Sequence, residues 1–335
     1  MTRRARITGT GMYVPDRVVD NDDLALLMDT TDEWIHKRTG IRSRHYIEDG
    51  QKPSELAEHA VRRALEAAGR AIDEIDCVVL ATLSGEADFP GTSFFLQERL
   101  ELGDVPCFDI RAQCSGFVYA LSVADAFVRA GNYQRVLVVG CEVHSTGLDR
   151  TTEGRDVAVL FGDGAGAVVV EASPDPDDPS GILAVRLHAE GRHARRLWVE
   201  APGSGLTPVR LTPEMLAQKR HFPHMDGRFV FKHAVTRMPE VLEEALTAAE
   251  LKLVDVDHFL FHQANLRINE YVAQQLGIPP EKCPSNIRKY GNCSAASIPM
   301  LLDENVRAGR ICAGDVVALT SFGSGFSWTS AVLRW

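Results

Sequence analysis

The chain has 335 residues, of which 45% are hydrophobic and 24% are charged, and its formal net charge at pH 7 is −10. This composition is typical of a globular protein with a large core. The negative charge argues against general nucleic-acid binding, because contacts to phosphates need a basic surface. The seven cysteines are odd in number and include no C-x-x-C pair, which favours reduced thiols over a disulfide framework.

The sequence contains no run of about 18 apolar residues, and residues 1–15 lack the long apolar core of a signal peptide. We therefore expect a cytoplasmic protein with no membrane span. The eleven histidines form no H-E-x-x-H motif, and His221 and His224 lie in a proline-containing stretch typical of a loop. We expect no metal site and no cofactor.

Strand and helix patterns alternate along the first half of the chain. The predicted elements are a strand at Arg6–Thr10, an amphipathic helix at Ser54–Ala68 ended by Gly69, a buried strand at Cys77–Thr82, a turn and helix within Leu83–Leu100, and a strand at Gln134–Glu142. Asp156–Val170 follows as two apolar β-type runs around Gly162–Gly166. Their glycines lack the G-x-G-x-x-G spacing, so we interpret them as a tight turn where backbones pass closely, not as a dinucleotide site.

Cys114 occupies the most distinctive stretch, Val105–Gly131. This stretch predicts a short strand at Pro106–Ile110, a turn, and a buried helix that starts at or just after Cys114. A cysteine there lies against unpaired N–H groups at the positive end of the helix dipole, which favours the thiolate. We interpret Cys114 as a candidate nucleophile. The alternative is that it only packs in the core, as most buried cysteines do.

The second half of the chain repeats the first in outline. Ser173–Gly181 is rich in Pro, Asp and Ser and predicts a linker between residues 1–172 and 182–335. Phe259–Asn265 corresponds to Val78–Ser84, and Ala295–Gly309 corresponds to the helix after Cys114. The sequence therefore predicts an α/β fold built by internal duplication.

Polar residues occupy corresponding places in the two halves. His262 follows a predicted buried strand, and Asn292 precedes a predicted helix, as Cys114 does. If the two halves are related by pseudo-symmetry, the three residues meet at one site. Cys114 would then be a nucleophile that attacks a thioester, and His262 and Asn292 would be two N–H donors that hold an enolate oxyanion. Gly323–Gly325 follows the last long strand and could bring the Ser324 region of the backbone close to the sulfur. The backbone N–H groups of Ser324 and Cys114 would then form a second oxyanion hole, which serves the acyl transfer.

Trp34 and Arg38 are four residues apart in Thr31–Ile41, so they would share a helix face and could hold a flat ring by stacking and cation–π contact. The alternative is a tryptophan anchored in the core beside a solvated arginine. Spacing alone favours that alternative.

Together these motifs resemble the 3-oxoacyl-ACP synthase III family of the thiolase superfamily. The matching motifs are DEWI-x-x-RTGI at Asp32–Ile41, CSGF-x-Y-A-L at Cys114–Leu121, R-D-x-x-V-L-FGDGAGA at Arg155–Ala167, MDGR-x-VFK at Met225–Lys232, HQAN-x-RI at His262–Ile268 and GN-x-SAASIP at Gly291–Pro299. The resemblance implies a five-layered αβαβα thiolase-like fold with two pseudo-repeated halves. It also implies a homodimer that starts fatty-acid chains by ping-pong Claisen condensation.

The resemblance assigns roles to single residues. It implies that Cys114 takes an acyl primer from acyl-CoA, and that His262 and Asn292 promote decarboxylation of malonyl-ACP. For CoA, the resemblance implies that Trp34 and Arg155 hold the adenine, that Arg38 binds the nucleotide phosphates, and that Arg228 and Asn265 also contact the molecule. It further implies that Asn265 supports His262 and that Phe89 shapes the acyl pocket of the partner subunit. Docking of acyl carrier protein is implied for Lys232 and Arg267.

Several positions depart from the family pattern, namely Cys293, Ser324, Arg228 and His233. Ser324 replaces a glycine, so it could narrow the pocket or move the oxyanion hole. One alternative function is a secondary-metabolism relative that transfers an acyl group elsewhere or joins two acyl chains. Relatives that join two chains use a glutamate near the position of Phe89, and Glu86 is close to it. Another alternative is a non-catalytic binding subunit, against which the retained cysteine and histidine argue.

Overall fold

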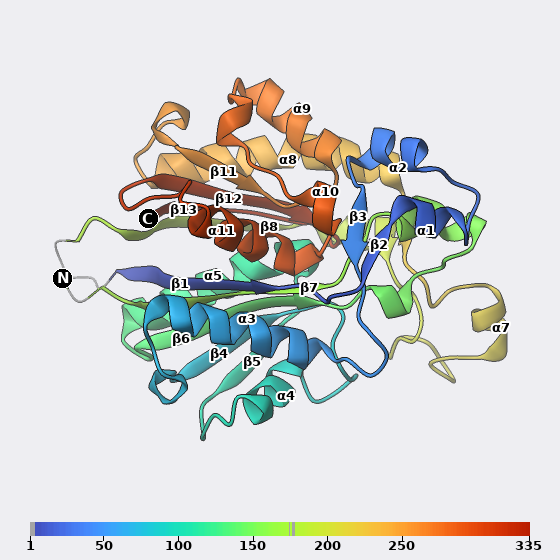
Figure 1. The fold of residues 1–335 in the computed structure, drawn as a ribbon, viewed down its shortest axis with the longest axis horizontal. Coiled ribbons are helices and arrows are strands. Elements are labelled where there is room, and N and C mark those ends of the chain that lie inside the picture. Colours follow the sequence, from blue (N-terminus) through green and yellow to red (C-terminus); the bar gives the residue numbers. More distant parts are fainter. Residues whose placement is uncertain (1–3, 174, 176–177) are drawn as a thin grey trace.

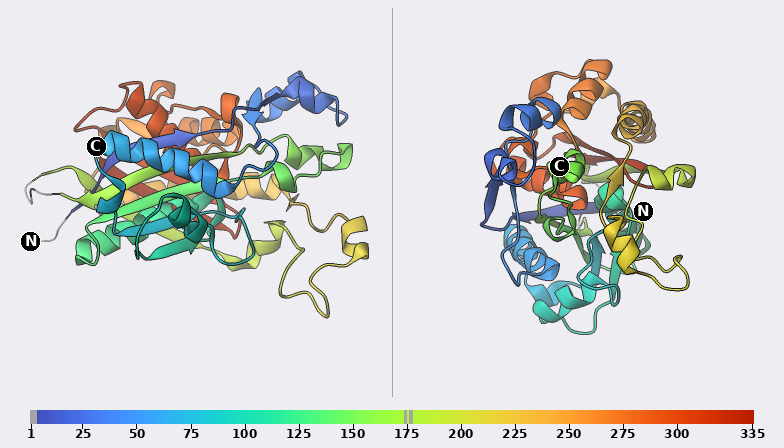
Figure 2. Two further views of the ribbon diagram at one scale, coloured as in Figure 1. Left: turned by 60° about the horizontal axis from the view of Figure 1, so that its bottom comes forward. Right: turned by 90° about the vertical axis from the view of Figure 1, so that its right-hand side faces the viewer.

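The computed structural model describes residues 4–335 except residues 174, 176 and 177. Two β-sheets lie one above the other, with two helices between them and further helices on both outer faces (Figure 1). This is the five-layered αβαβα arrangement expected from the sequence. The short helix α7 (Pro213–Ala217) and its loops project from one end of the molecule, opposite the C-terminus (Figures 1 and 2).

The first sheet has five strands in the order β1 (Ala5–Tyr13), β7 (Gly164–Ala172), β6 (Arg135–Glu142), β4 (Cys77–Ala81) and β5 (Cys107–Ile110). β4 pairs in parallel with both β6 and β5, whereas β7 is antiparallel to β6 and β1. The central strands are buried on both faces, which explains their near-continuous apolar runs.

The second sheet has four strands in the order β8 (Gly181–Ala189), β13 (Ser327–Arg334), β12 (Val316–Gly323) and β11 (His258–Phe261). Only the β11–β12 pair is parallel. The order and directions match those of β1, β7, β6 and β4, so the two halves have the same topology. The predicted linker falls between β7 and β8, where the chain passes from one sheet to the other, and residues 174, 176 and 177 of it lie outside the described residues.

The central layer consists of α5 (Gly116–Ala130) and α11 (Ser297–Arg307), which pack against both sheets. The side chains of Phe117, Leu121 and Ala124 are at most 1% exposed, so the helix after Cys114 is buried as expected. One outer layer holds α3 (Pro53–Ala68) and α4 (Thr92–Arg99), and the other holds α8 (Gly227–Ala248) and α9 (Leu266–Leu276). In α3, Pro53 occupies the first turn and Gly69 ends the helix in a left-handed conformation.

Shorter elements cover the end of the sheets where α2 and α7 lie (Figure 1). They are β2 (Val18–Asp20), α1 (Asn21–Ala25), α2 (Asp32–Thr39), β3 (Ser43–His45), α6 (Arg155–Ala158), β9 (Leu197–Trp198), β10 (His224–Met225) and α10 (Ile287–Tyr290). Among the described residues, no helix is both long and apolar enough to cross a membrane.

The glycine-rich stretch after Asp156 confirms one expectation and corrects another. The first apolar run is not a strand, because residues 155–158 form α6 and only Phe161 makes a β-bridge, to Asn292. The second run is β7. A Cβ at Gly166 would lie 2.8 Å from the backbone nitrogen of Met300, so this glycine does allow a close approach of two segments.

Candidate active site

Cys114 lies at a sharp bend between β5 and α5. A single 3₁₀ turn, Gln113–Ser115, precedes the helix, and Gln113 has a left-handed φ of 47°. The corresponding turn of the second half, Ser294–Ala296, precedes α11, and Ser294 has a φ of 43°. Such values are costly for residues with a side chain, so tertiary packing must hold both bends. The two bends meet, because the Ser294 hydroxyl donates to Cys114 Sγ at 3.5 Å.

Burial determines the protonation of Cys114, which is 8% exposed. Burial raises the pKa of this thiol to about 11, although the Ser294 hydroxyl and the backbone N–H groups of Cys114 and Ser324 pull it down. The thiolate expected from the helix N-terminus is therefore wrong for the resting protein. The loss of water outweighs these hydrogen bonds, so the pKa of the thiol stays above neutral pH and the sulfur carries its proton.

Gly323 brings the last loop against the nucleophile. A Cβ at this position would lie 2.8 Å from Cys114 Cβ and 3.1 Å from its backbone nitrogen. This contact places the Ser324 N–H beside the sulfur, as the position of the glycines predicted. The Ser324 side chain turns away and donates a hydrogen bond to the Leu197 carbonyl. The serine therefore does not narrow the space in front of the sulfur.

His262 follows β11 and is only 2% exposed. Its Nδ1 lies 2.6 Å from Ser297 Oγ, which also accepts the Gln263 backbone N–H at 3.3 Å. The serine hydrogen is thus free to point to Nδ1, and we assign the imidazole proton to Nε2 on this basis. Nε2 is buried and has no hydrogen-bond partner among the described residues. Burial lowers the pKa of His262 to about 3, so the ring is a neutral N–H donor at pH 7.

Asn292 is held by the first half of the chain. Its backbone N–H donates to the Leu160 carbonyl at 2.8 Å, and its carbonyl accepts the Gly162 N–H at 3.1 Å. Its side-chain Oδ1 accepts the Ser294 backbone N–H at 2.8 Å, which leaves the NH₂ group facing elsewhere as a donor. Ser294 therefore contacts both Cys114 and Asn292, and His262 is bound three residues further along. The three predicted residues lie around one short segment, 294–297.

Two buried residues at the end of β6 were not singled out from the sequence. Glu142 accepts hydrogen bonds from the Ser84 hydroxyl and the Ala295 N–H, and burial raises its pKa to about 7. His144 packs on Phe161 with 4.6 Å between ring centroids, and its Nε2 is buried without a partner among the described residues. Burial lowers the pKa of His144 to about 3. The rule that selected His262, a histidine after a buried strand, would also have found His144.

Trp34 and Arg38 share a face of α2, as their spacing predicted. The Arg38 guanidinium lies 4.2 Å from the centroid of the indole ring, and that of Arg155 lies 5.1 Å from it. Trp34 is half-buried and Arg38 is exposed. Two cations on one aromatic ring, at the end of the sheets that carries the short elements, form a platform suited to a nucleotide.

Asn265 has a different role from the one expected beside His262. It caps α9 by accepting the Arg267 backbone N–H at 3.0 Å, and it donates to the Arg38 carbonyl at 3.1 Å. Within the described part of the chain it makes no hydrogen bond to His262. That support comes from Ser297 and from Asn269, whose Nδ2 donates to the His262 carbonyl at 3.2 Å. The reason is that the asparagine lies at the helix N-terminus, where unpaired N–H groups compete for its oxygen.

The remaining predicted residues lie on the surface. Arg228 and Lys232 on α8 and Arg267 on α9 are exposed. Phe89 is 82% exposed. Glu86 is not directed to Cys114, because its carboxylate accepts the Ser54 backbone N–H at 3.2 Å at the start of α3.

The duplicated fold and the buried cysteine, histidine and asparagine define a thiolase-fold condensing enzyme. Residues 108–191 match the family described as 3-Oxoacyl-[acyl-carrier-protein (ACP)] synthase III, and residues 246–335 match the C-terminal part of the same family. The chain belongs to this family, and it is an acyltransferase of the beta-ketoacyl-ACP synthase III type.

Individual relatives cover almost the whole chain. A beta-ketoacyl-[acyl-carrier-protein] synthase III of Xanthomonas campestris is 46% identical over 99% of this chain and 98% of its own. One from Rhizorhabdus wittichii is 44% identical over 99% and 100%. The solved 3-oxoacyl-[acyl-carrier-protein] synthase III of Aquifex aeolicus superposes with a TM-score of 0.89 at 41% identity, covering 99% of this chain and 100% of that one. The reaction that joins two acyl chains is not favoured by these matches.

Proposed function

We propose that the protein condenses an acyl group held on Cys114 with malonyl-ACP and releases CO₂ and 3-oxoacyl-ACP. The observation that carries this proposal is the His262 Nε2–H, a buried neutral donor with no protein partner among the described residues, beside the hydrogen-bonded group of Cys114, Ser294 and Asn292. A buried donor without a partner is costly, and a substrate oxygen would satisfy it.

In the first half-reaction the Cys114 sulfur attacks the thioester carbon of acyl-CoA. The carbonyl oxygen becomes an oxyanion between the backbone N–H groups of Cys114 and Ser324. The bond to the CoA sulfur then breaks, and the proton of the Cys114 thiol ends on CoA. Because the resting sulfur is protonated, the hydrogen bond that it accepts from the Ser294 hydroxyl and the two backbone N–H groups must stabilise the charge that develops during attack.

In the second half-reaction the thioester carbonyl of malonyl-ACP accepts hydrogen bonds from His262 Nε2–H and the Asn292 amide. Loss of CO₂ leaves an enolate whose oxygen these two donors stabilise. Its carbon attacks the acyl-Cys114 thioester and expels the thiolate, which then takes up a proton. A neutral histidine suits this step, because a charged one would bind the malonyl carboxylate and oppose its loss.

The surface residues support the proposed substrates. Trp34, Arg38 and Arg155 would hold the CoA nucleotide, with Arg228 and Asn265 further along it. Lys232 and Arg267 are exposed cations that would attract an acidic carrier protein despite the net charge of −10. The reaction needs no cofactor apart from acyl-CoA as substrate.

We also propose a homodimer in the cytoplasm. Three phenylalanines of one region are well exposed, with Phe89 at 82%, Phe94 at 49% and Phe108 at 40%. Large exposed aromatic groups of this kind favour a protein interface. The seven cysteines are all free, which supports a reducing compartment.

Intact-protein mass spectrometry tests the reaction directly. The protein is incubated with a panel of acyl-CoAs and then treated with malonyl-ACP. We expect a covalent acyl adduct that discharges only with malonyl-ACP, and loss of the adduct in Cys114→Ala. His262→Ala should form the adduct but not discharge it. Cys312→Ala, which removes an exposed thiol, is the matched control and should behave as wild type. An adduct on Cys114→Ala would contradict the assignment of the nucleophile.

A further inference from the structure

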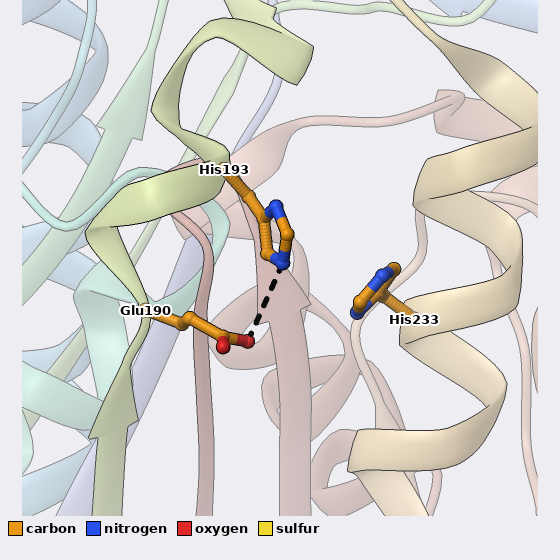
Figure 3. A group of neighbouring side chains, drawn as sticks. All are labelled: Glu190, His193 and His233. Atoms are coloured by element: carbon orange, nitrogen blue, oxygen red, sulfur yellow. Dashed lines mark ion pairs between the residues drawn. The ribbon is translucent and has the colours of Figure 1, made fainter.

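Glu190, His193 and His233 form a cluster that the proposed reaction does not use. Glu190 follows β8, His193 lies in the 3₁₀ segment Gly191–Arg196, and His233 lies in the second turn of α8. Figure 3 shows Glu190 beside His193, with His233 facing them from the neighbouring helix. One nitrogen of each imidazole and one carboxylate oxygen lie within 4.8 Å of one another.

We propose that these three residues bind one divalent transition-metal ion of the zinc class. Two imidazole nitrogens and one carboxylate oxygen are a ligand set that zinc accepts, with the remaining positions open to water. Ligand atoms about 2.0–2.1 Å from a tetrahedral ion lie about 3.4 Å apart, so these three atoms, which lie within 4.8 Å of one another, would have to draw together around an ion. The sequence predicted no metal site. It could not reveal this one, because the three ligands are far apart in the sequence and match no spacing motif. The site goes beyond the proposed condensation, none of whose steps uses these three residues.

The Glu190 carboxylate is paired with Arg192 and Arg237, but its two oxygens are not equally satisfied. Its Oε2 is buried and makes no hydrogen bond among the described residues, and it lies 3.6 Å from His193 Nε2. A buried carboxylate oxygen without a hydrogen bond, beside two imidazole rings, is an environment that a metal ion would complete.

Cations also surround the cluster and set a limit on its affinity. Arg192 and Arg237 both reach Glu190, and Lys232 precedes His233. The Arg192 side chain is 71% exposed, and Arg237 is 3.8 Å from Glu190 but pairs with Glu240 at 2.8 Å. Both arginines can therefore move away from Glu190 without leaving a buried charge unpaired.

The cluster is coupled to the loop of the proposed oxyanion hole. The backbones of Glu190 and Phe326 exchange two hydrogen bonds, of 2.7 and 3.0 Å. The Phe326 ring lies 5.4 Å from that of His193 and 5.5 Å from that of His233, between centroids. Phe326 is two residues after Ser324, so a bound ion would brace this loop from behind. Without an ion, the two histidines only extend an aromatic cluster with Phe229.

Cobalt provides a spectroscopic test on the full-length protein. The tag-free protein is freed of metal with a chelator, kept reduced, and titrated with CoCl₂ and, separately, with ZnCl₂ in a calorimeter. We expect one equivalent of either metal to bind, with visible d–d absorption from Co²⁺. Zn²⁺ should displace Co²⁺. His233→Val and Glu190→Gln should lower the affinity at least tenfold, and a thermal melt of each variant without metal verifies that it is folded.

His188→Asn is the matched control, because it removes another histidine that pairs with a glutamate, Glu244, at 2.6 Å. It should bind metal as wild type does. The proposal is overturned if folded His233→Val and wild type bind Co²⁺ equally, if no stoichiometric binding occurs, or if the bound Co²⁺ shows only the charge-transfer bands of cysteine thiolates.

Discussion

His262 Nδ1 lies 2.6 Å from the hydroxyl of Ser297, the first residue of α11. This hydrogen bond places the proton on Nε2, where decarboxylation needs it. Ser297→Ala should therefore leave acylation of Cys114 unchanged and slow the malonyl-ACP discharge by about 5- to 150-fold, the effect of about 1–3 kcal/mol for one lost buried hydrogen bond. Mass spectrometry of the two half-reactions measures both rates.

Ser330→Ala controls for the Ser297 variant, because Ser330 is also buried and hydrogen-bonded, to Thr320 at 3.1 Å, but does not bind His262. It should slow neither half-reaction. Nitrogen NMR of the imidazole should show a change of tautomer only in Ser297→Ala. Equal loss of both half-reactions would mean that Ser297 acts on the fold instead of on His262.

Gly323→Ala should impair acylation. The new methyl group would meet Cys114 Cβ at 2.8 Å, so the sulfur or the loop must shift. Overpacking of this kind typically costs about 1–3 kcal/mol, and we expect adduct formation to slow at least tenfold. Gly103→Ala is the control, since a Cβ there meets no atom within 4 Å. Wild-type acylation of Gly323→Ala would contradict the proposed contact between this loop and the sulfur.

Trp34→Ala should weaken binding of the nucleotide part of CoA. Stacking of a base on an aromatic ring is worth about 1–3 kcal/mol, so KM for acyl-CoA should rise about 5- to 150-fold with little change in kcat. The sharpest control is a second substrate, the acyl-pantetheine thioester, which lacks the nucleotide. Its kcat/KM should be the same for both proteins. An equal loss with both substrates would show that Trp34 supports the fold of α2 and not the adenine.

Reversal of charge at Lys232 and Arg267 should weaken the encounter with the carrier protein. In Lys232→Glu/Arg267→Glu we expect KM for malonyl-ACP to rise by at least tenfold and the effect to shrink at high salt, because surface attraction is screened. Acylation of Cys114 by acyl-CoA, which needs no carrier protein, should not change. Exposed Lys37→Glu on α2 serves as the control for charge alone.

His144 should make the fold sensitive to acid. Its pKa is lowered to about 3, so the unfolded chain binds a proton below pH 6.5 that the folded chain does not. Stability is therefore lost as the pH falls, by about 2 kcal/mol between pH 6.5 and 5 for this residue. In His144→Leu the loss of stability on acidification should be smaller by that amount, as measured by urea unfolding at pH 7 and pH 5.

The comparison of His144→Leu with wild type isolates His144 from other buried groups. His262, whose pKa is also lowered, likewise reduces the stability of the fold as the pH falls. Glu142 has the opposite effect, because its pKa is raised to about 7 and its contribution to stability is lost as the pH rises. The exposed His224→Asn should keep the wild-type slope. An unchanged slope in His144→Leu would mean that His144 is protonated in the folded protein.

Local periodicity was sufficient to predict most elements and the order of the two halves. The helix after Cys114 and the strands β4 and β6 begin and end within about two residues of their predicted positions, because their apolar spacing and the flanking turn residues are local signals. The first run of Asp156–Val170 was predicted wrongly. Short apolar runs are ambiguous, and here contacts of Leu160 and Phe161 with Asn292 decide the backbone.

Chemistry at the site depended on contacts between distant residues. The sequence located Cys114, His262 and Asn292 from their positions beside strands and helices. It could not show that Cys114 is a thiol at rest, that Ser297 sets the His262 tautomer, or that Glu190, His193 and His233 meet. A pKa is decided by burial and neighbouring charges, and a ligand cluster by the packing of separate elements. These quantities exist only in the folded chain, so the tertiary structure alone determines them.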